Sequence, residues 1–319
     1  MRAVILDSFA LREGDIDWSA LRALVDVTAS YPRTAPAEVA ARLQGAQIAV
    51  VNKAFIGEEV LRACPELAFV CVTATGTDSL DIAACRRHGV PVANVPGYAT
   101  ESVAQHTLAL MLSLCGCPGR WDASVRAGHW QLDVPQDGSV FAEDELCGKT
   151  LGLVGYRAIA RRVAVLAQAF GMRVACSTRT VREAWADDGV SFVSLDALMA
   201  MSDVISLHCP ATPATVNLLN ARTLSLCRPG VRIVNTARGA LVDEPALIAA
   251  LQSGQAAGFA ADVCAHEPVP ADSPLLRAPH VLLTPHIAWA SPQALARLAH
   301  IVAADVASYL EGGSLNVVN

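Results

Sequence analysis

The sequence predicts an α/β protein with two parallel sheets that are covered by helices. Short apolar or β-branched runs alternate with segments of helical spacing through almost all of the 319 residues, a pattern typical of parallel strands joined by crossover helices. A chain of this length suits two domains of roughly 100–200 residues each. Its residues are 53% hydrophobic and 17% charged, which allows two buried cores and argues against a disordered protein.

The first series of elements lies in the N-terminal third of the chain. Segment 1–10 contains the apolar run Ala3–Leu6 and is expected to form the first strand. Further strands are expected at 47–51, 68–72 and 91–94, and helices at 36–43, 58–64 and 79–88. This alternation predicts a first parallel sheet with its own crossover helices.

The second series begins at Lys149 and contains more strands. Successive strands are expected at 150–154, 173–176, 204–208, 232–235, 258–261 and 281–283. The helices between them are expected at 159–170, 195–201, 221–226 and 245–253. Six strands that alternate with helices predict a doubly wound nucleotide-binding sheet.

Two longer helices join and close these series. An apolar helix at 101–115 leads from the first series towards the second, and an amphipathic helix at 292–310 follows the last strand. The second of these helices is expected to return and cover the first domain, which makes that domain discontinuous. The predicted domains are residues 1–98 plus 289–319 and residues 99–288.

Segment 118–147 is the one long stretch with weak periodicity. It contains Gly and Pro residues together with Trp121 and Trp130. Two interpretations stay open for it, a linker or an arm that packs on a partner subunit, because exposed aromatic side chains often mark interfaces.

The charge and hydropathy of the chain argue against nucleic-acid and membrane partners. Net charge is −6, the pI is about 5.7, and no Lys/Arg-dense stretch occurs. The longest apolar stretch, Leu108–Cys117, is shorter than the roughly 20 residues that span a bilayer. The N-terminus also lacks the long apolar segment and cleavage site of a signal peptide. A cytoplasmic protein is therefore expected.

The ten cysteines are expected to be reduced thiols. Cys71, Cys176 and Cys209 lie in or beside apolar, strand-like runs, where cysteine acts as a small hydrophobic residue. Cys115 and Cys117 are close together, but no second ligand pair accompanies them as in a zinc site. No metal is predicted.

A glycine-containing turn follows the first strand of the second series. Gly155 stands at the first glycine position of a dinucleotide-binding fingerprint, Arg157 at the second and Ala160 at the third. Alanine is a mild change at the third position. Arginine at the second brings a side chain to the place where backbone approaches the pyrophosphate, which puts cofactor affinity in doubt.

The end of the next strand bears on the choice of cofactor. An acidic residue there would bind the ribose hydroxyls of the adenosine and repel a 2′-phosphate. The strand instead ends in Ser177, Thr178 and Arg179, which are suited to bind that phosphate. NADP is therefore slightly favoured over NAD, and the alternative is a surface arginine without a cofactor role.

Three later strands end in residues that together suit 2-keto acid chemistry. Arg238, Glu267 and His286 follow successive strands, and ligands of open α/β sheets bind at the carboxyl ends of strands. Arginine offers a fork to a carboxylate, histidine delivers a proton to a developing alkoxide, and glutamate keeps the imidazole charged. The sequence therefore predicts hydride transfer between a nicotinamide cofactor and a small 2-keto or 2-hydroxy acid.

Over essentially its whole length the chain resembles the D-isomer-specific 2-hydroxyacid dehydrogenases. The matching segments are Thr75–Asp78, Ser102–His106, Gly148–Gly152 and the three segments around Arg238, Glu267 and His286. Segments 102–106 and 285–290, with Trp289, are most similar to the glycerate dehydrogenase/hydroxypyruvate reductase branch. The resemblance implies a Rossmann nucleotide-binding domain, a smaller flavodoxin-like substrate domain, and a homodimer.

The resemblance also implies roles for individual residues. Arg238 would bind the substrate carboxylate, His286 would be the acid/base, and Glu267 would be its partner. The other substrate-binding residues would be Lys53 and the backbone of Ala74, Thr75 and Gly76. The cofactor-binding residues would be Val103 and Asp262 at the nicotinamide, Thr236 and Ala237 at its ribose, Ala158 and Ile159 at the pyrophosphate, together with Gly155, Arg157, Ser177, Thr178, Arg179, Pro210 and Ala288.

The implied substrate is hydroxypyruvate, glyoxylate or a similar short 2-keto acid, or the D-isomer of the hydroxy acid. Arg157 leaves three possibilities open: the loop adapts, the cofactor binds weakly, or activity is impaired. The alternative function is a cofactor-sensing or corepressor-like binding protein, although the complete trio of Arg238, Glu267 and His286 favours an enzyme.

Overall fold

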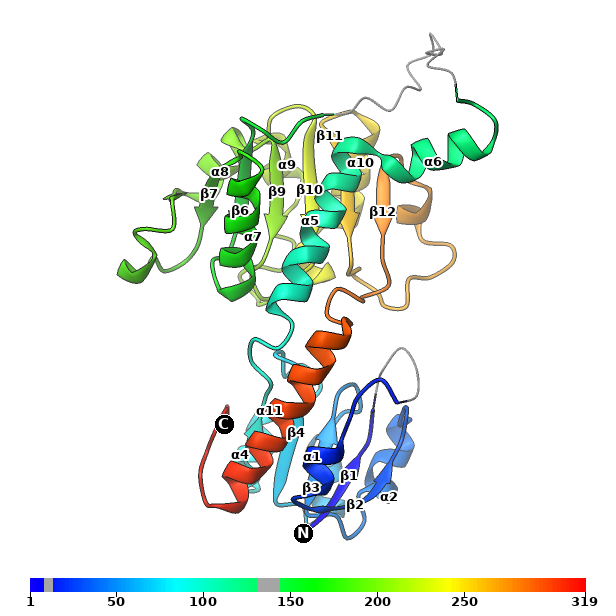
Figure 1. Ribbon diagram of the computed structural model, residues 1–319, viewed down its shortest axis with the longest axis vertical. Coiled ribbons are helices and arrows are strands. Elements are labelled where there is room, and N and C mark those ends of the chain that lie inside the picture. The colour runs from blue at the N-terminus through cyan, green and yellow to red at the C-terminus, as the bar shows by residue number, and fades with distance from the viewer. Residues whose placement is uncertain (9–13, 131–143) are drawn as a thin grey trace. The chain divides into compact units, whose positions relative to one another are not determined.

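The computed structural model describes residues 1–8, 14–130 and 144–319, and these form two compact units (Figure 1). Unit 1 contains residues 1–99 and 290–319, and unit 2 contains residues 100–289. The end of the expected first-strand segment and residues 131–143 of segment 118–147 lie outside the described residues.

Unit 1 is built on a five-stranded parallel sheet. Its strands are β1 (Arg2–Ile5), β2 (Asp26–Ser30), β3 (Ile48–Val51), β4 (Phe69–Val72) and β5 (Val92–Ala93). Their order in the sheet is β2-β1-β3-β4-β5, the order of flavodoxin-like folds. The sequence pattern did not predict β2, a partly exposed edge strand in which Val27 is the one large apolar residue.

Helices cover both faces of this sheet. On one face lie α2 (Val39–Arg42), α3 (Glu58–Ala63) and α4 (Ile82–Arg87), and on the other lie α1 (Ser19–Arg22) and α11 (Pro292–Leu310). Helix α4 begins later than predicted because the Asp81 carboxylate accepts a hydrogen bond from the Ala84 amide and caps the helix there. Helix α11 has the predicted bounds, and its Tyr309 ring stacks on Phe69 of β4 at 4.4 Å.

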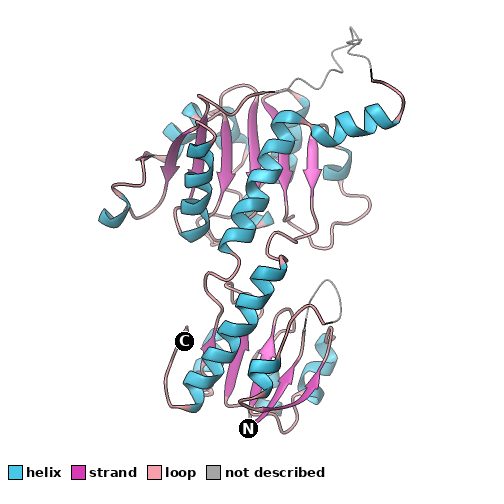
Figure 2. Cartoon of the chain, in the orientation of Figure 1, coloured by secondary structure: helices cyan, strands magenta, loops and turns pink. Residues whose placement is uncertain are grey.

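Unit 2 is built on a seven-stranded parallel sheet, shown in magenta in Figure 2. Its strands are β6 (Thr150–Val154), β7 (Arg173–Ser177), β8 (Val190–Phe192), β9 (Val204–Leu207), β10 (Val231–Asn235), β11 (Ala256–Ala261) and β12 (Val281–Leu283). The order is β12-β11-β10-β9-β6-β7-β8, so the doubly wound nucleotide-binding fold is confirmed. The predicted count of six strands was wrong, because the edge strand β8 is short and its sequence, Val-Ser-Phe, contains no apolar run.

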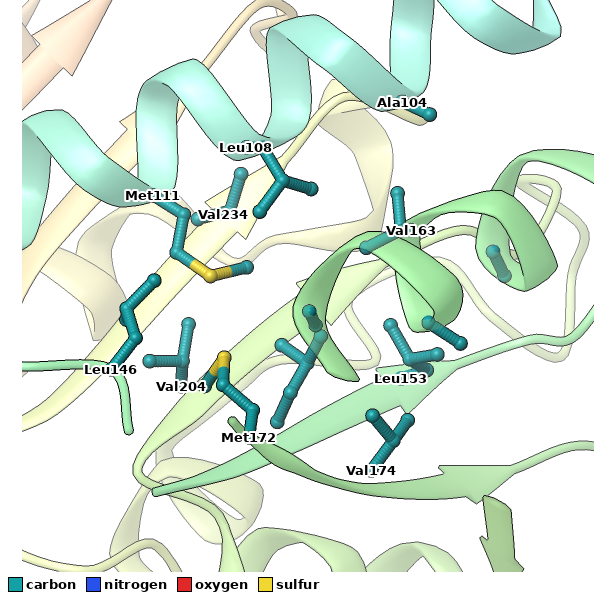
Figure 3. Packing of buried hydrophobic residues seen from close by; sticks show 14 of the residues in the cluster. Ala104, Leu108, Met111, Leu146, Leu153, Val163, Met172, Val174, Val204 and Val234 are labelled. Carbon is teal, nitrogen blue, oxygen red and sulfur yellow. The ribbon is translucent and has the colours of Figure 1, made fainter. Parts of the chain in front are cut away.

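Two layers of helices enclose this sheet. Helices α5 (Thr100–Gly116) and α7 (Ala158–Ala169) pack on one face, and α8 (Leu195–Met201), α9 (Ala221–Ser225) and α10 (Glu244–Gln252) on the other. In the core under α5 and α7, Leu108 and Met111 approach Val234 and Val204 of the central strands (Figure 3). Segment 118–147 was expected to be irregular, but it begins with a helix, α6 (Pro118–Arg126). Short 3-10 helices form at η1 (Pro36–Glu38), η2 (Glu183–Trp185), η3 (Gly239–Leu241) and η4 (Pro274–Arg277).

Two further properties concern the described residues alone. Within these ranges, no helix combines the length and the apolar character that a membrane crossing requires. All ten cysteines are free thiols.

Candidate active site

Three loops at one edge of the unit 2 sheet carry the predicted catalytic residues. Arg238 follows β10, Glu267 follows β11 and His286 follows β12, and these three strands are neighbours in the sheet. Because all of them run parallel, their carboxyl ends lie at the same edge. This is the edge at which ligands of doubly wound sheets bind.

His286 and Glu267 form a short hydrogen bond at this edge. The imidazole Nδ1 lies 2.6 Å from a Glu267 carboxylate oxygen, and the two side chains are 33% and 35% exposed. The second Glu267 oxygen accepts a hydrogen bond of 3.2 Å from the Cys264 amide. The carboxylate is therefore held from two sides, and the imidazole Nε2 is left as the nitrogen that a substrate can meet.

The backbone at His286 adopts an uncommon conformation. Its φ is +55°, in the left-handed region that residues other than glycine seldom enter. The turn is held by two hydrogen bonds: the His286 amide donates to the Thr284 carbonyl at 3.0 Å, and the Trp289 indole donates to the His286 carbonyl at 2.7 Å. Such conformations cluster at functional sites, where surrounding contacts maintain them.

Asp262 holds the loop that carries His286. One of its carboxylate oxygens accepts from the Thr284 hydroxyl at 2.6 Å and from the Ile287 amide at 2.9 Å. The other accepts from the Ala288 amide at 2.8 Å. The Asp262 side chain is only 1% exposed, so its visible role is to shape segment 284–288. Its implied contact with a nicotinamide stays a prediction.

Helix α5 contributes two further polar side chains to this region. His106 Nε2 lies 2.9 Å from the Thr284 hydroxyl and 3.6 Å from Asp262. Thr107 shares a hydrogen bond of 2.8 Å with Thr236, which precedes Arg238 by two residues. Thr107 and Thr284 were not predicted from the sequence as site residues, and His106 entered only as part of a family segment.

The loop of Arg238 is shaped by Asn235 and Gly239. The buried Asn235 side chain accepts from the Ala237 amide at 3.0 Å and donates to the Arg238 carbonyl at 2.9 Å. A Cβ on Gly239 would lie 1.9 Å from the backbone of Cys264, so the two loops touch backbone to backbone. Since the Cys264 amide also binds Glu267, the loops of Arg238 and Glu267 are packed together.

Arg238 itself is half-buried. One of its guanidinium nitrogens donates to the Ala237 carbonyl at 2.8 Å. Next to this loop, Cys264 is also half-buried, and burial raises the pKa of its thiol to about 11. The Cys264 thiol is therefore neutral near pH 7.

The predicted dinucleotide turn has the backbone that a fingerprint glycine requires. Gly155 has a φ of +89°, and a Cβ there would lie 2.9 Å from the Cys209 amide nitrogen. Gly155 follows β6 and Cys209 follows β9, the two strands between which the sheet order reverses. This reversal is the point at which doubly wound folds bind dinucleotides.

Arg157 lies at the N-cap of α7, with an exposed side chain. Its φ of −129° and ψ of −166° are ordinary extended values, so the backbone conformation itself does not require glycine at this position. The Arg157 side chain makes no capping hydrogen bond. The first amides of α7, including those of Ala158 and Ile159, therefore remain suited to an anion.

The other expected cofactor residues lie at the same edge or on α5. Ser177 ends β7, and half-buried Thr178 and exposed Arg179 follow it. After β9, Pro210 is exposed, and burial lowers the pKa of nearby His208 to about 4, so that imidazole is neutral. Residues packed more closely are the buried Val103 on α5, the buried Ala288, and the half-buried Thr236 and Ala237.

The expected substrate residues of the first domain lie at the carboxyl edge of the unit 1 sheet. Lys53 follows β3 and is exposed, while residues 74–76 follow β4. The buried Asp7 carboxylate accepts from the amides of residues 52–54 at 2.7–3.0 Å and so fixes the turn of Lys53. In the described part of the chain, no acceptor binds the amides of Ala74, Thr75 and Gly76.

The chain is similar to known proteins over its whole length. The family model for the D-isomer specific 2-hydroxyacid dehydrogenase, NAD binding domain, matches residues 108–288. Hydroxypyruvate reductase of Blautia hydrogenotrophica is 37% identical over 322 residues and covers 100% of both chains. Glycerate dehydrogenase of Methylorubrum extorquens is 37% identical over 286 residues, 89% of this chain and 88% of that one.

A solved structure shows the same likeness. An acyclic imino acid reductase in complex with NADPH and D-Arg aligns with a TM-score of 0.89 and 28% identity, and the alignment covers 100% of both chains. The matched NAD-binding model spans the unit 2 sheet with Gly155 and the His286–Glu267 pair. The chain therefore belongs to the D-isomer specific 2-hydroxyacid dehydrogenase family, and it is an enzyme that uses a nicotinamide dinucleotide.

Proposed function

We propose that the protein reduces hydroxypyruvate, glyoxylate or a similar short 2-keto acid to the D-isomer of the 2-hydroxy acid, and catalyses the reverse oxidation. The observation that carries this proposal is the His286–Glu267 pair of 2.6 Å at the edge that also presents Arg238. The named activities of the two relatives, a hydroxypyruvate reductase and a glycerate dehydrogenase, support this substrate class.

His286 is the proposed acid and base. Glu267 holds Nδ1 at 2.6 Å, which orients the imidazole ring. In the direction of reduction, protonated Nε2 donates a proton to the oxygen at C2 as charge develops there. In the direction of oxidation, neutral Nε2 accepts the proton of the hydroxyl group.

Arg238 and residues 74–76 are the proposed carboxylate-binding groups. A guanidinium binds a carboxylate through two parallel hydrogen bonds, which fixes the orientation of the acid. The amides of Ala74, Thr75 and Gly76 offer further donors, since the described residues supply no acceptor for them. Lys53 would add a positive charge beside them.

The residues at the point where the strand order reverses, between β6 and β9, fit a nicotinamide dinucleotide. The close approach of Gly155 to Cys209 leaves room for no side chain, and the uncapped first turn of α7 offers amides to a pyrophosphate. When bound, the dinucleotide supplies or takes up the hydride. Val103, Thr236, Ala237 and Ala288 would line its nicotinamide half.

NADP is the favoured form of the cofactor. Ser177, Thr178 and Arg179 stand where an acidic residue would select NAD, and Arg179 is exposed. Replacement of Arg179 by alanine is expected to weaken NADPH binding about tenfold and to leave NADH binding within twofold, because one charge-assisted hydrogen bond to the 2′-phosphate is lost. The matched control is Arg182→Ala, an arginine close in the chain that lies over the Trp185 ring. Equal losses for both cofactors would contradict the proposal.

A titration with both cofactors also decides the role of Arg157. Fluorescence titrations of the wild type and of Arg157→Gly with NADPH and NADH compare the two turns directly. Because the Arg157 backbone is extended and its side chain exposed, we expect the dissociation constants to agree within about threefold. Tenfold tighter binding by Arg157→Gly would identify the side chain as an obstruction.

The activity itself is tested by the absorbance of NADPH in the presence of hydroxypyruvate, glyoxylate and pyruvate. Arg238→Lys keeps the charge but loses the planar fork, so kcat/KM is expected to fall about 100-fold. Arg222→Lys is the matched control, because Arg222 binds Asp196 through two exposed hydrogen bonds. The assignment of Arg238 fails if both variants keep the wild-type kcat/KM. Cofactor binding without turnover of any acid would favour a sensor.

We also propose a homodimer built on unit 2. Its described surface exposes the apolar side chains of Leu112, Val125, Trp130, Val165 and Phe170. Leu112 and Phe170 line a surface cavity of about 360 Å³, which a second copy would cover. Analytical ultracentrifugation is expected to give twice the chain mass of 33.4 kDa, and a monomer at micromolar concentration would exclude the dimer. The cytoplasmic location stays a prediction.

A further inference from the structure

Residues 94 and 95 bind the carbonyl groups of loop 74–76, whose amides are proposed to bind the substrate carboxylate. The Val95 amide donates to the Ala74 carbonyl at 3.0 Å. The Asn94 side chain donates through Nδ2 to the Thr75 carbonyl at 2.7 Å. The Thr75 hydroxyl in turn donates to the Val95 carbonyl at 2.9 Å.

These bonds determine where the loop amides point. A trans peptide unit is planar, so its N–H points opposite to its C=O. The bond to the Ala74 carbonyl therefore orients the Thr75 amide, and the bond from Asn94 to the Thr75 carbonyl orients the Gly76 amide. The first bond comes from backbone, which any residue at 95 except proline can supply. The second depends on the Asn94 side chain.

Asn94 is itself held by the last residues of the chain. Its amide donates to the Asn316 carbonyl at 3.2 Å, and the Asn316 side chain donates to the buried Asp305 carboxylate at 2.8 Å. Asn319 then binds the strand before Asn94, since it accepts from the Val92 amide at 2.8 Å and donates to the Val90 carbonyl at 2.9 Å. Segment 316–319 thus runs along the edge strand β5 and fixes the backbone from which the Asn94 side chain extends.

We propose that Asn94 is a positioning residue that, held by segment 316–319, aims the Gly76 amide at the substrate carboxylate. This inference rests on the proposed function of residues 74–76 as a carboxylate-binding loop. It adds to that function a residue with no contact to the acid. It also assigns a role at the substrate site to a segment more than 200 residues away in the chain.

The inference predicts a change in substrate affinity without a matching change in chemistry. The carboxylate is bound in the ground state and in the transition state alike, so loss of an oriented donor raises KM and leaves kcat nearly constant. In Asn94→Ala, the KM for hydroxypyruvate is expected to rise about tenfold, the value for one net hydrogen bond. The kcat and the KM for NADPH are expected to stay within twofold. Asn319→Ala is expected to give a smaller rise of the same kind.

The matched control is Gln44→Ala. Gln44 donates from its side-chain amide to the Ala63 carbonyl at 3.1 Å, the same kind of bond, but it lies before β3 and hence at the amino edge of the unit 1 sheet. This variant is expected to leave both KM values within twofold of the wild type. A rise equal to that of Asn94→Ala would show a general loosening of unit 1 and overturn the inference.

A measurement on the resting protein separates this inference from the proposed function. The NMR order parameter of the Gly76 amide is expected to fall from about 0.85 to below about 0.6 in Asn94→Ala. The Thr75 amide, oriented by backbone, serves as an internal reference and is expected to change little. If the order parameter of the Gly76 amide is unchanged in Asn94→Ala, the inference is overturned, even if the wild type reduces hydroxypyruvate. The inference is also overturned if this order parameter falls but the KM for hydroxypyruvate is unchanged. A wild type that reduces no 2-keto acid overturns the proposed function, and the substrate role of Asn94 with it.

Discussion

Replacement of Asp262 by asparagine tests whether this carboxylate shapes the loop of His286. Asp262 accepts three hydrogen bonds through its two oxygens, from Thr284, Ile287 and Ala288. Asparagine has nearly the same shape but only one acceptor atom. If that oxygen stays with Thr284 and Ile287, an N–H group of the new side chain faces the Ala288 amide, and two donors meet at a position that water does not reach.

The loss of stability expected for Asp262→Asn follows from these contacts. One charge-assisted hydrogen bond is lost and one buried donor is left unsatisfied, which together cost about 2–4 kcal/mol of unfolding free energy. For a unit of this size, the thermal midpoint is expected to fall by about 5–15 °C. The kcat/KM for hydroxypyruvate is expected to fall as well, because segment 284–288 places His286.

Calorimetry and the absorbance assay check this estimate, with Asp305→Asn as the matched control. Asp305 is also about 1% exposed, but among the described residues it accepts only from Asn316 and, at 3.9 Å, from the Cys71 thiol. The control is expected to show no fall in midpoint at pH 7. An Asp262→Asn protein with wild-type stability and activity would refute the reasoning, because it would show that the loop keeps its form without the third acceptor.

Three further changes test other parts of the structure. Burial raises the pKa of Asp305 from 3.8 to about 6, so the folded state binds the proton more tightly and this group's stabilisation is lost as pH rises from about 4 to 6, by up to roughly 3 kcal/mol. Asp305→Asn is therefore expected to unfold at a higher temperature than the wild type at pH 7 and at the same temperature at pH 4. If the difference in unfolding temperature between the two proteins is the same at both pH values, the raised pKa of Asp305 is contradicted. In Gly155→Ala, alanine would have to adopt a φ of +89°, and its Cβ would lie 2.9 Å from the Cys209 amide nitrogen. We therefore expect the turn to distort and cofactor binding to weaken at least tenfold. Gly119→Ala, which meets nothing within 4 Å, is its control in the same titration. Gly239→Ala places a Cβ at 1.9 Å from Cys264 and is expected to separate the loops of Arg238 and Glu267, with a fall in kcat/KM of more than 100-fold; retention of full activity would show that the loops need not touch.

Much of the architecture could be predicted because it follows from local pattern. The strand–helix alternation gave the long central elements of both sheets, and the order Arg238, Glu267, His286 along successive strands predicted a common edge. Two edge strands, β2 and β8, were missed because they are partly exposed and lack an apolar run.

Long-range hydrogen bonds could not be predicted from the sequence. His106 and Thr284 are 178 positions apart, and Asn94 meets Asn316 across a similar gap. Nothing in local composition marks such pairs, because they exist only once two segments are placed side by side by the fold. The same holds for Arg157, whose extended backbone depends on how α7 begins.

The discontinuous course of unit 1 has a consequence for how the protein is made. Helix α11 covers β4 through the Phe69–Tyr309 stack, yet residues 100–289 are synthesised between these two partners. At about 5–20 residues per second, a ribosome needs roughly 10–40 s for that stretch. Through this interval one face of β4 lacks its native cover, so the nascent N-terminal sheet offers an apolar surface that chaperones can bind until the final helix emerges.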